Sequence, residues 1–184
     1  NGLTDLLHPC QVLADLLTIS EYKGDLKGKK LCYVGDGNNM AHSLLYGCTK
    51  VGMDISIATP DKYKCDETVM SNALKIAAET GSKVEFTNNP KQAMENADAV
   101  YTDTWVSMGM EAEKQQRIKD FAGFEVNREL MDIAKPDAMF LHCLPAYRGY
   151  EVSADVIDGK QSAIFDEAEN RLHAQKAVMA TLMK

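Results

Sequence analysis

The stretch Asp137-Ala-Met-Phe-Leu-His-Cys-Leu-Pro145 decides how this chain is expected to fold. Its first five residues form a mostly apolar run directly after the helix breaker Lys135-Pro136, as expected for a buried strand. The strand then ends in an imidazole, a thiol and a rigid turn. Ligands of open α/β sheets bind at the carboxyl ends of the strands, so this segment is a candidate binding site. The alternative is that Cys143 is a small buried hydrophobic residue and His142 a hydrogen-bonded core histidine.

Composition limits the class of protein. The chain has 184 residues, 45% apolar and 26% charged, which suits one globular domain with a full core. A net charge of −7 gives no basic nucleic-acid footprint. We find no signal-peptide pattern and no apolar run of the roughly 18 residues that a membrane span needs, so we expect neither membrane nor nucleic-acid partners. Residue 1 is Asn rather than Met, which suggests a piece of a longer chain.

The five cysteines lie at positions 10, 32, 48, 65 and 143, without any paired spacing. This pattern speaks against a disulfide framework or a structural zinc site, and it fits the reducing cytoplasm. We therefore expect a cytoplasmic protein without a bound metal. Cys143 stands in a motif at a strand exit, where a thiol can be partly exposed. We expect it to be the functional thiol and the first cysteine to be alkylated.

Apolar runs alternate with amphipathic stretches along the chain. Strands are predicted at 31–34, 54–59, 83–87, 97–102 and 137–141, with a sixth short extended run at 162–165. Helices are predicted within 1–28 and at 40–50, 66–80, 90–96, 127–134, 153–159 and 167–183, and a solvated helix at 111–121. This alternation predicts an α/β fold, namely a Rossmann-like three-layer domain with a five-stranded parallel sheet and helices on both faces. Right-handed crossovers favour the strand order 3-2-1-4-5.

That strand order brings three polar segments to one crevice. Asn38 and Asn39 would leave the first strand, Asp103 the fourth and Cys143 the fifth. The first and fourth strands are neighbours at the point where the strand order reverses, which is where ligands bind in such sheets. We expect the site at this edge.

The turn Gly35-Asp-Gly-Asn-Asn39 is only part of a dinucleotide motif. Met40 replaces the third glycine of GxGxxG, and no acidic residue follows the second strand at the ribose-binding place. A dehydrogenase-type nucleotide domain is therefore disfavoured, and we expect no cofactor. The two asparagines could bind a small ligand, or they could only tolerate turn dihedrals and cap the next helix.

A second candidate for ligand binding is His8-Pro-Cys-Gln11 at the start of the first helix. Pro9 suits the first helical position, and the free N–H groups of a helix start attract anions. An ordinary capped helix would have the same pattern.

Several of these segments together resemble the ornithine carbamoyltransferases. The motifs are His8-Pro-Cys-Gln11, Gly35-Asp-Gly-Asn-Asn39, Asp103-Thr-Trp-Val-Ser-Met-Gly109, His142-Cys-Leu-Pro145 and Glu167-Ala-Glu-Asn-Arg171. Aspartate-type relatives usually have His-Pro-Leu-Pro in place of the fourth motif. The likeness runs from His8 to the C-terminus.

The resemblance implies that the δ-amine of L-ornithine attacks carbamoyl phosphate to give L-citrulline and phosphate. It implies carbamoyl-phosphate binding by His8, Gln11, Cys143, Leu144 and Arg171, and ornithine binding by Asn39, Asp103, Ser107 and Met108. His8 would stabilise the developing oxyanion, while Asp103 and Cys143 would position the amine and accept its proton. The alternatives are a surface arginine at 171, a turn cap at 103 and a core methionine at 108.

The family's N-terminal domain, with its Ser-Thr-Arg-Thr motif, has no counterpart in this sequence. Residues 1–184 therefore resemble the ornithine-binding domain alone. We expect the chain to fold but not to catalyse the reaction by itself, and we expect the full-length protein to be a homotrimer or a multiple of one. The alternative from another class is a stand-alone amino-acid or anion-binding module without catalysis.

Overall fold

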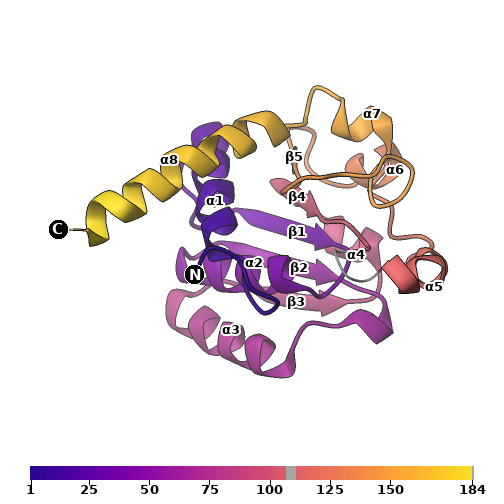
Figure 1. The fold of residues 1–184 in the computed structure, drawn as a ribbon, viewed down its shortest axis with the longest axis horizontal. Helices are drawn as coiled ribbons and strands as arrows, with labels where there is room; N and C mark the ends of the chain where they lie inside the picture. Colours follow the sequence, from indigo (N-terminus) through magenta and orange to yellow (C-terminus); the bar gives the residue numbers. More distant parts are fainter. Residues whose placement is uncertain (107–110, 184) are drawn as a thin grey trace.

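Five parallel strands form one sheet in the order β3-β2-β1-β4-β5 (Figure 1). The structure is a computed structural model that describes residues 1–106 and 111–183. The strands are β1 (Lys30–Val34), β2 (Asp54–Ala58), β3 (Val84–Thr87), β4 (Ala99–Thr102) and β5 (Met139–Leu141). The predicted fold class, strand order and direction are confirmed.

Helices connect the strands. They are α1 (Pro9–Lys23), α2 (Asn39–Lys50), α3 (Glu67–Thr80), α4 (Pro90–Met94), α5 (Lys114–Asp120), α6 (Arg128–Met131), α7 (Ala154–Ile157) and α8 (Ile164–Leu182), with 3-10 turns at Asp61–Tyr63 and Glu111–Glu113. The predicted extended run at 162–165 is wrong beyond Ser162, which makes a single parallel bridge to Phe140. Helix α8 already begins at Ile164, with Asp166 and Glu167 in its first turn, where acidic side chains are favoured.

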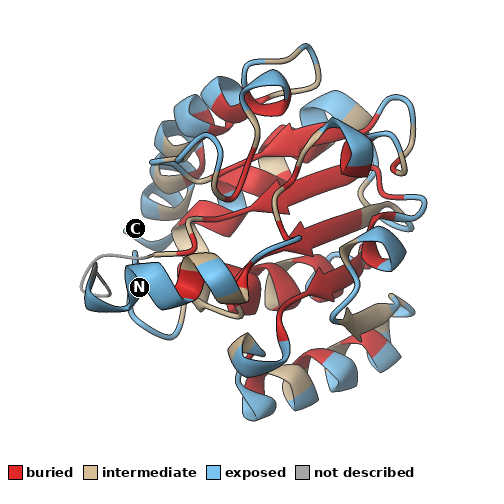
Figure 2. Cartoon of the chain, turned by 90° about the vertical axis from the view of Figure 1, so that its right-hand side faces the viewer, coloured by how far each residue is buried: buried red, intermediate tan, exposed pale blue. Residues whose placement is uncertain are grey.

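Alternate side chains of each strand enter two different hydrophobic clusters. Leu31 and Tyr33 of β1 pack with α1, α2 and α3, whereas Cys32 and Val34 pack with α4, α6 and α7. Strands β1, β2, β4 and β5 are consequently almost wholly buried, whereas the edge strand β3 is half-buried (Figure 2). Helix α8 lies beside α1, and its C-terminal end extends away from the sheet (Figure 1).

The turn after β1 approaches a neighbouring segment closely. A Cβ atom on Gly37 would lie 2.4 Å from the backbone nitrogen of Cys65, so only glycine fits there. The N–H of Gly37 donates to the carbonyl oxygen of Tyr63 at 2.8 Å. The turn places Asn38 at the N-cap of α2, where its side-chain oxygen accepts hydrogen bonds from the N–H groups of Met40 and Ala41.

None of the described helices combines the length and the apolarity needed to cross a bilayer.

Candidate active site

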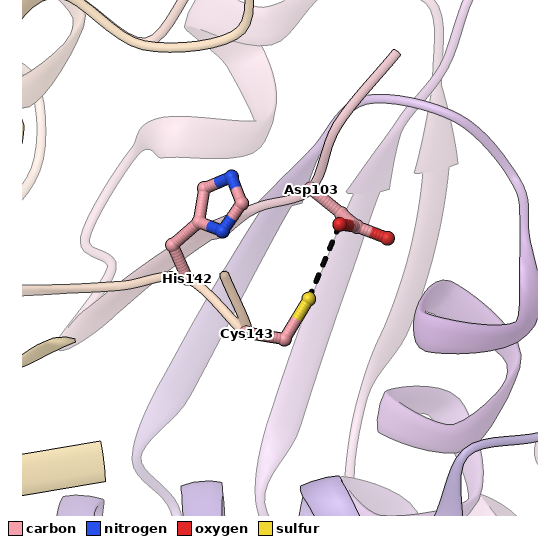
Figure 3. A group of neighbouring side chains, drawn as sticks. All are labelled: Asp103, His142 and Cys143. Atoms are coloured by element: carbon pink, nitrogen blue, oxygen red, sulfur yellow. Dashed lines mark hydrogen bonds between the residues drawn. The ribbon is translucent and has the colours of Figure 1, made fainter. Parts of the chain in front are cut away.

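Three polar side chains meet at the carboxyl edge of the sheet. Asp103 follows β4 and Cys143 follows β5, and these strands are parallel neighbours. The Cys143 thiol donates to Oδ1 of Asp103 at 3.1 Å, as Figure 3 shows. Nδ2 of Asn38, which follows β1, donates to Oδ2 of Asp103 at 2.7 Å. The predicted convergence of three strand exits is thus confirmed.

The Asp103 carboxylate is buried, with 6% of the residue exposed. Besides Asn38 and Cys143, its own neighbour Thr104 donates a backbone N–H to Oδ1 at 2.7 Å. These three donors fix the orientation of the carboxylate, and none of them is a cation. The arrangement is suited to a positively charged partner that approaches from the open edge of the sheet.

The thiol of Cys143 is a hydrogen-bond donor, not a nucleophile. Burial, and then the Asp103 carboxylate, raise the pKa of Cys143 well above its ordinary value. Because the thiolate is the reactive form, this raised pKa favours slow rather than early alkylation of Cys143, and the order of labelling stays a prediction. Of the two predicted proton acceptors, Cys143 acts as a donor in this arrangement, whereas both oxygens of Asp103 accept hydrogen bonds.

The turn after β5 is held by its own histidine. Nδ1 of His142 accepts the Leu144 N–H at 2.9 Å, so the ring proton lies on Nε2, which faces Oε1 of Glu151 at 3.4 Å. Leu144 has a φ of 57°, a conformation that non-glycine residues rarely adopt. His142 is thus buried and hydrogen-bonded through Nδ1, which shapes the turn that carries Cys143, while its Nε2 has no hydrogen-bond partner among the described residues.

Asp103, His142 and Cys143 bring one potential metal-ligand atom each within 4.8 Å of one another. In this arrangement Nδ1 of His142 is occupied by the Leu144 N–H, and the Cys143 sulfur is protonated. A metal ion would have to displace both interactions, and it also requires a deprotonated sulfur. The geometry is therefore that of a hydrogen-bonded cluster rather than a preformed metal centre.

His8 caps α1 through its backbone and lies near both charged groups of the edge. Its Nδ1 is 2.8 Å from the carbonyl oxygen of Gly2, which assigns the ring proton to Nδ1 in the neutral form. Burial is the main cause of a lowered pKa for His8; Arg171 lowers it further, while Asp103 raises it. In this tautomer Nε2 is an acceptor. His8 can donate to an oxyanion from Nε2 only as the imidazolium.

Gln11 and Arg171 are brought together by α1 and α8. Nη1 of Arg171 donates a hydrogen bond to Oε1 of Gln11 at 2.6 Å. The amide nitrogen of Gln11 donates to Asp15 at 2.9 Å and to Glu167 at 3.0 Å, so both amide protons are used. Only the second lone pair of the Gln11 oxygen is left for a ligand. Arg171 is half-buried and is not a free surface arginine.

Asn39 does not share the position of Asn38. Its Nδ2 donates to the carbonyl oxygen of Thr4 at 2.8 Å, which ties the N-terminal segment to the start of α2. Ligand binding by Asn39 stays a prediction. Ser107 and Met108 lie outside the described residues.

Comparison with known proteins agrees with this geometry. The family described as "Aspartate/ornithine carbamoyltransferase, Asp/Orn binding domain" matches residues 27–182. The chain belongs to this carbamoyltransferase family. It is 60% identical over 179 residues to the ornithine carbamoyltransferase of Caldicellulosiruptor saccharolyticus, covering 97% of this chain and 58% of that protein. It is 56% identical over 183 residues to the anabolic enzyme of Pyrococcus furiosus, covering 100% of this chain and 58% of that protein.

Solved carbamoyltransferase structures have the same fold. The ornithine carbamoyltransferase of Pyrococcus furiosus matches with a TM-score of 0.94 and 56% identity over 98% of this chain and 57% of that one. The enzyme of Gloeobacter violaceus matches with a TM-score of 0.93 and 50% identity over 100% of this chain and 61% of that one. The chain therefore spans about three fifths of its relatives' length.

A cavity of about 140 Å³ flanks the carboxyl edge of the sheet. It lies between the segment after Asp103 and the loop after β5, and it is lined by Thr104, Trp105, Val106, Lys114, Ile118, Tyr147, Tyr150 and Glu151. Three of these eight residues are aromatic. The cavity begins at Thr104, the chain neighbour of Asp103, and extends toward α5.

Sequence reasoning missed a buried ion pair beside this candidate site. Arg117 of α5 is 4% exposed, pairs with Asp36 in the turn after β1 and donates from Nε to the Trp105 carbonyl oxygen. Its guanidinium lies 4.5 Å from the centre of the Tyr63 ring. Helix α5 is therefore anchored to the site, not merely solvated as predicted. The surrounding charged residues gave no signal that this one arginine is buried.

Proposed function

We propose that this chain is the ornithine-binding domain, residues 1–184, of an ornithine carbamoyltransferase. The reaction transfers the carbamoyl group of carbamoyl phosphate to the δ-amine of L-ornithine and yields L-citrulline and phosphate. The observation that carries the proposal is the buried Asp103 carboxylate, fixed by Asn38 and Cys143 at the carboxyl edge of the sheet. A carboxylate there attracts a cationic amino-acid side chain and repels an acidic one.

Asp103 would act on the attacking amine. A free alkylamine is protonated at neutral pH and must lose its proton before it can attack. Asp103 binds the ammonium form, orients the nitrogen and accepts a proton, while the Cys143 thiol keeps the carboxylate in place. Asn39, Ser107 and Met108 are proposed to hold the α-amino and α-carboxylate groups.

The carbamoyl phosphate would lie between α1 and the turn after β5. Arg171 binds a phosphate or carbonyl oxygen, and the remaining lone pair of Gln11 accepts a carbamoyl N–H. The backbone at Cys143 and Leu144 binds the same group. His8 stabilises the oxyanion from Nε2 when its ring is protonated, an interaction that grows in the transition state.

A second domain is needed for turnover. The leaving phosphate is strongly anionic, and His8 and Arg171 are few donors for it. We therefore propose a partner domain, such as the remaining two fifths of the relatives' length, and assembly into trimers in the cytoplasm. The five free cysteines agree with a reducing compartment.

Citrulline formation tests the proposal. The chain is assayed with saturating L-ornithine and carbamoyl phosphate, first alone and then with the N-terminal domain of the Caldicellulosiruptor saccharolyticus relative added in trans. We expect citrulline only in the second case, and trimers of the reconstituted protein by analytical ultracentrifugation. Calorimetry with L-ornithine, carbamoyl phosphate and NAD complements the assay. Ornithine binding with no citrulline in either assay would favour a binding module instead, and binding of NAD would overturn the assignment.

A further inference from the structure

Two acidic side chains meet in the interior between α1 and α8. Asp15 is 0% exposed and Glu167 is 1% exposed. Both accept a hydrogen bond from the amide nitrogen of Gln11, at 2.9 and 3.0 Å, so the two carboxyl groups lie on either side of one donor. Neither residue belongs to the set proposed to touch substrate. The pair lies directly behind that set, because Gln11 also holds Arg171.

The surroundings of the pair permit one negative charge but not two. Burial and mutual repulsion raise the pKa of Asp15 well above its ordinary value, and burial raises the pKa of Glu167. Two adjacent carboxylates without solvent or a directly bound cation cannot both ionise at low cost. The groups that face the pair are Tyr101, His142, Cys143, Cys48 and, through Gln11, Arg171.

The hydrogen bonds distinguish the two carboxyl groups. Glu167 accepts three donors: the Gln11 amide, the Tyr101 hydroxyl at 3.0 Å and the backbone N–H of His142 at 2.8 Å. Asp15 accepts only the Gln11 amide, and its Oδ2 meets no donor among the described residues. A carboxylate is stabilised by several donors, whereas a protonated acid needs few.

We propose that Asp15 is protonated and donates a hydrogen bond to the Glu167 carboxylate, and that this pair positions Gln11 and the turn at His142. Through Gln11 the pair orients Arg171, and through the His142 N–H it fixes the start of the turn that carries Cys143 and Leu144. One buried carboxylate thus aligns both parts of the proposed carbamoyl-phosphate site, namely Gln11 with Arg171 and the turn after β5. Glu167 is the positioning residue, and Asp15 supplies a hydrogen-bond donor to it; the effect on turnover rests on the proposed function.

The proposal predicts that two amide substitutions, similar in shape, have opposite outcomes. Asp15→Asn retains a donor toward Glu167 and should leave the site intact. Glu167→Gln replaces an acceptor oxygen by an NH₂ group, which must then face the Gln11 amide or the His142 N–H. The same change on the exposed face of α8, Glu169→Gln, is the matched control.

Kinetics of the chain reconstituted with the N-terminal domain test the positioning role. A misplacement of substrate-binding groups by about 1 Å can lower the rate about 100-fold, so we expect Glu167→Gln to lower kcat by about that factor. Asp15→Asn and Glu169→Gln should retain the kcat and the KM for carbamoyl phosphate of the parent. Equal losses in Asp15→Asn and Glu167→Gln would overturn the proposal, as would full activity of Glu167→Gln.

Infrared and NMR spectra of the 184-residue chain itself test the proton without relying on activity. We expect a carbonyl stretch of a protonated carboxylic acid at neutral pH, lost in Asp15→Asn and retained in Glu169→Gln. The amide resonance of His142 should shift in Glu167→Gln but not in Asp15→Asn. If the band is absent from the parent, or persists in Asp15→Asn, the assignment of the proton is wrong. If the spectra agree but the parent makes no citrulline, the proposed function fails and the proton assignment stands.

Discussion

Cys143 donates its thiol proton to Oδ1 of Asp103 across 3.1 Å, from one strand exit to the next. The carboxylate orients the thiol and keeps it protonated, and the thiol in turn occupies one lone pair of the carboxylate. Asn38 occupies the other oxygen from a third strand exit. The Asp103 carboxylate is therefore oriented before any substrate arrives, and this determines the first two predictions.

Replacing Asp103 by Asn should abolish most citrulline formation by the reconstituted enzyme. The amide cannot accept the amine proton, and its NH₂ group repels a cationic side chain, so we expect a loss of roughly 100- to 10,000-fold in kcat/KM. The measurement is steady-state kinetics with L-ornithine, and Asp61→Asn on the exposed surface is the control. Efficient carbamoylation of L-aspartate by the parent would contradict the specificity argument.

Cys143 should react slowly with iodoacetamide in the folded chain. Its raised pKa leaves little thiolate at neutral pH, and the reaction should become appreciable only in strongly alkaline solution. We expect mass mapping to find Cys10, which is half-buried near the chain start, modified before Cys143. Asp103→Asn removes the second cause of the shift and should accelerate labelling of Cys143. Faster labelling of Cys143 in the parent than in this variant would be incompatible with the thiol–carboxylate bond.

Removal of the buried guanidinium at position 117 should destabilise the fold. Arg117→Met leaves Asp36 buried without its cation and removes the bond to Trp105, and breaking such a pair costs about 3–5 kcal/mol. Urea unfolding measures the change in the free energy of unfolding. The control is Arg148→Met, which disrupts a solvent-exposed pair with Asp158 and should change stability far less. Equal effects of the two substitutions would refute the anchoring role of Arg117.

Asp36 should make stability depend on pH in the direction opposite to that of an aspartate whose pKa is lowered on folding. Burial raises its pKa to about 6, although Arg117 partly counteracts this. Between the unfolded value near 3.8 and about 6, the folded state binds more protons, so stability falls as pH rises through that window and levels off above it. A shift of this size corresponds to about 3 kcal/mol in total. The difference in unfolding free energy between the parent and Asp36→Asn, followed from pH 4 to 7, should show this slope; a flat difference would exclude it.

The sheet was predictable because its signals are local and repetitive. Short apolar runs separated by amphipathic stretches predict parallel strands, and handedness then limits the order. The error at 162–165 arose where Phe165 looks like a strand residue but is 77% exposed on the first turn of α8. Apolar side chains near a helix start resemble an extended run when no turn signal precedes them.

The candidate site was predictable only in part, because motifs name positions and not contacts. The placement of Asp103 beside Cys143 followed from topology. The contact of Asn38, rather than Asn39, with Asp103 did not follow, since adjacent residues at a helix start point in different directions. Asp15 carried one usable signal. It lies three residues after Val12 and four before Ile19, inside the apolar stripe of α1, where an acidic side chain requires a buried partner.

The hydrogen bonds of this edge join residues that are very far apart along the chain. Cys143 and Asp103 are separated by 40 positions, and Gln11 and Glu167 by 156. Closing such long loops is slow, so the Gln11–Glu167 bond forms only when the first and last helices have docked. Binding of carbamoyl phosphate, which we propose at Gln11 and Arg171, would therefore report this docking rather than secondary structure alone. A nascent chain that ends before Glu167 would contain all five strands and still lack this part of the site.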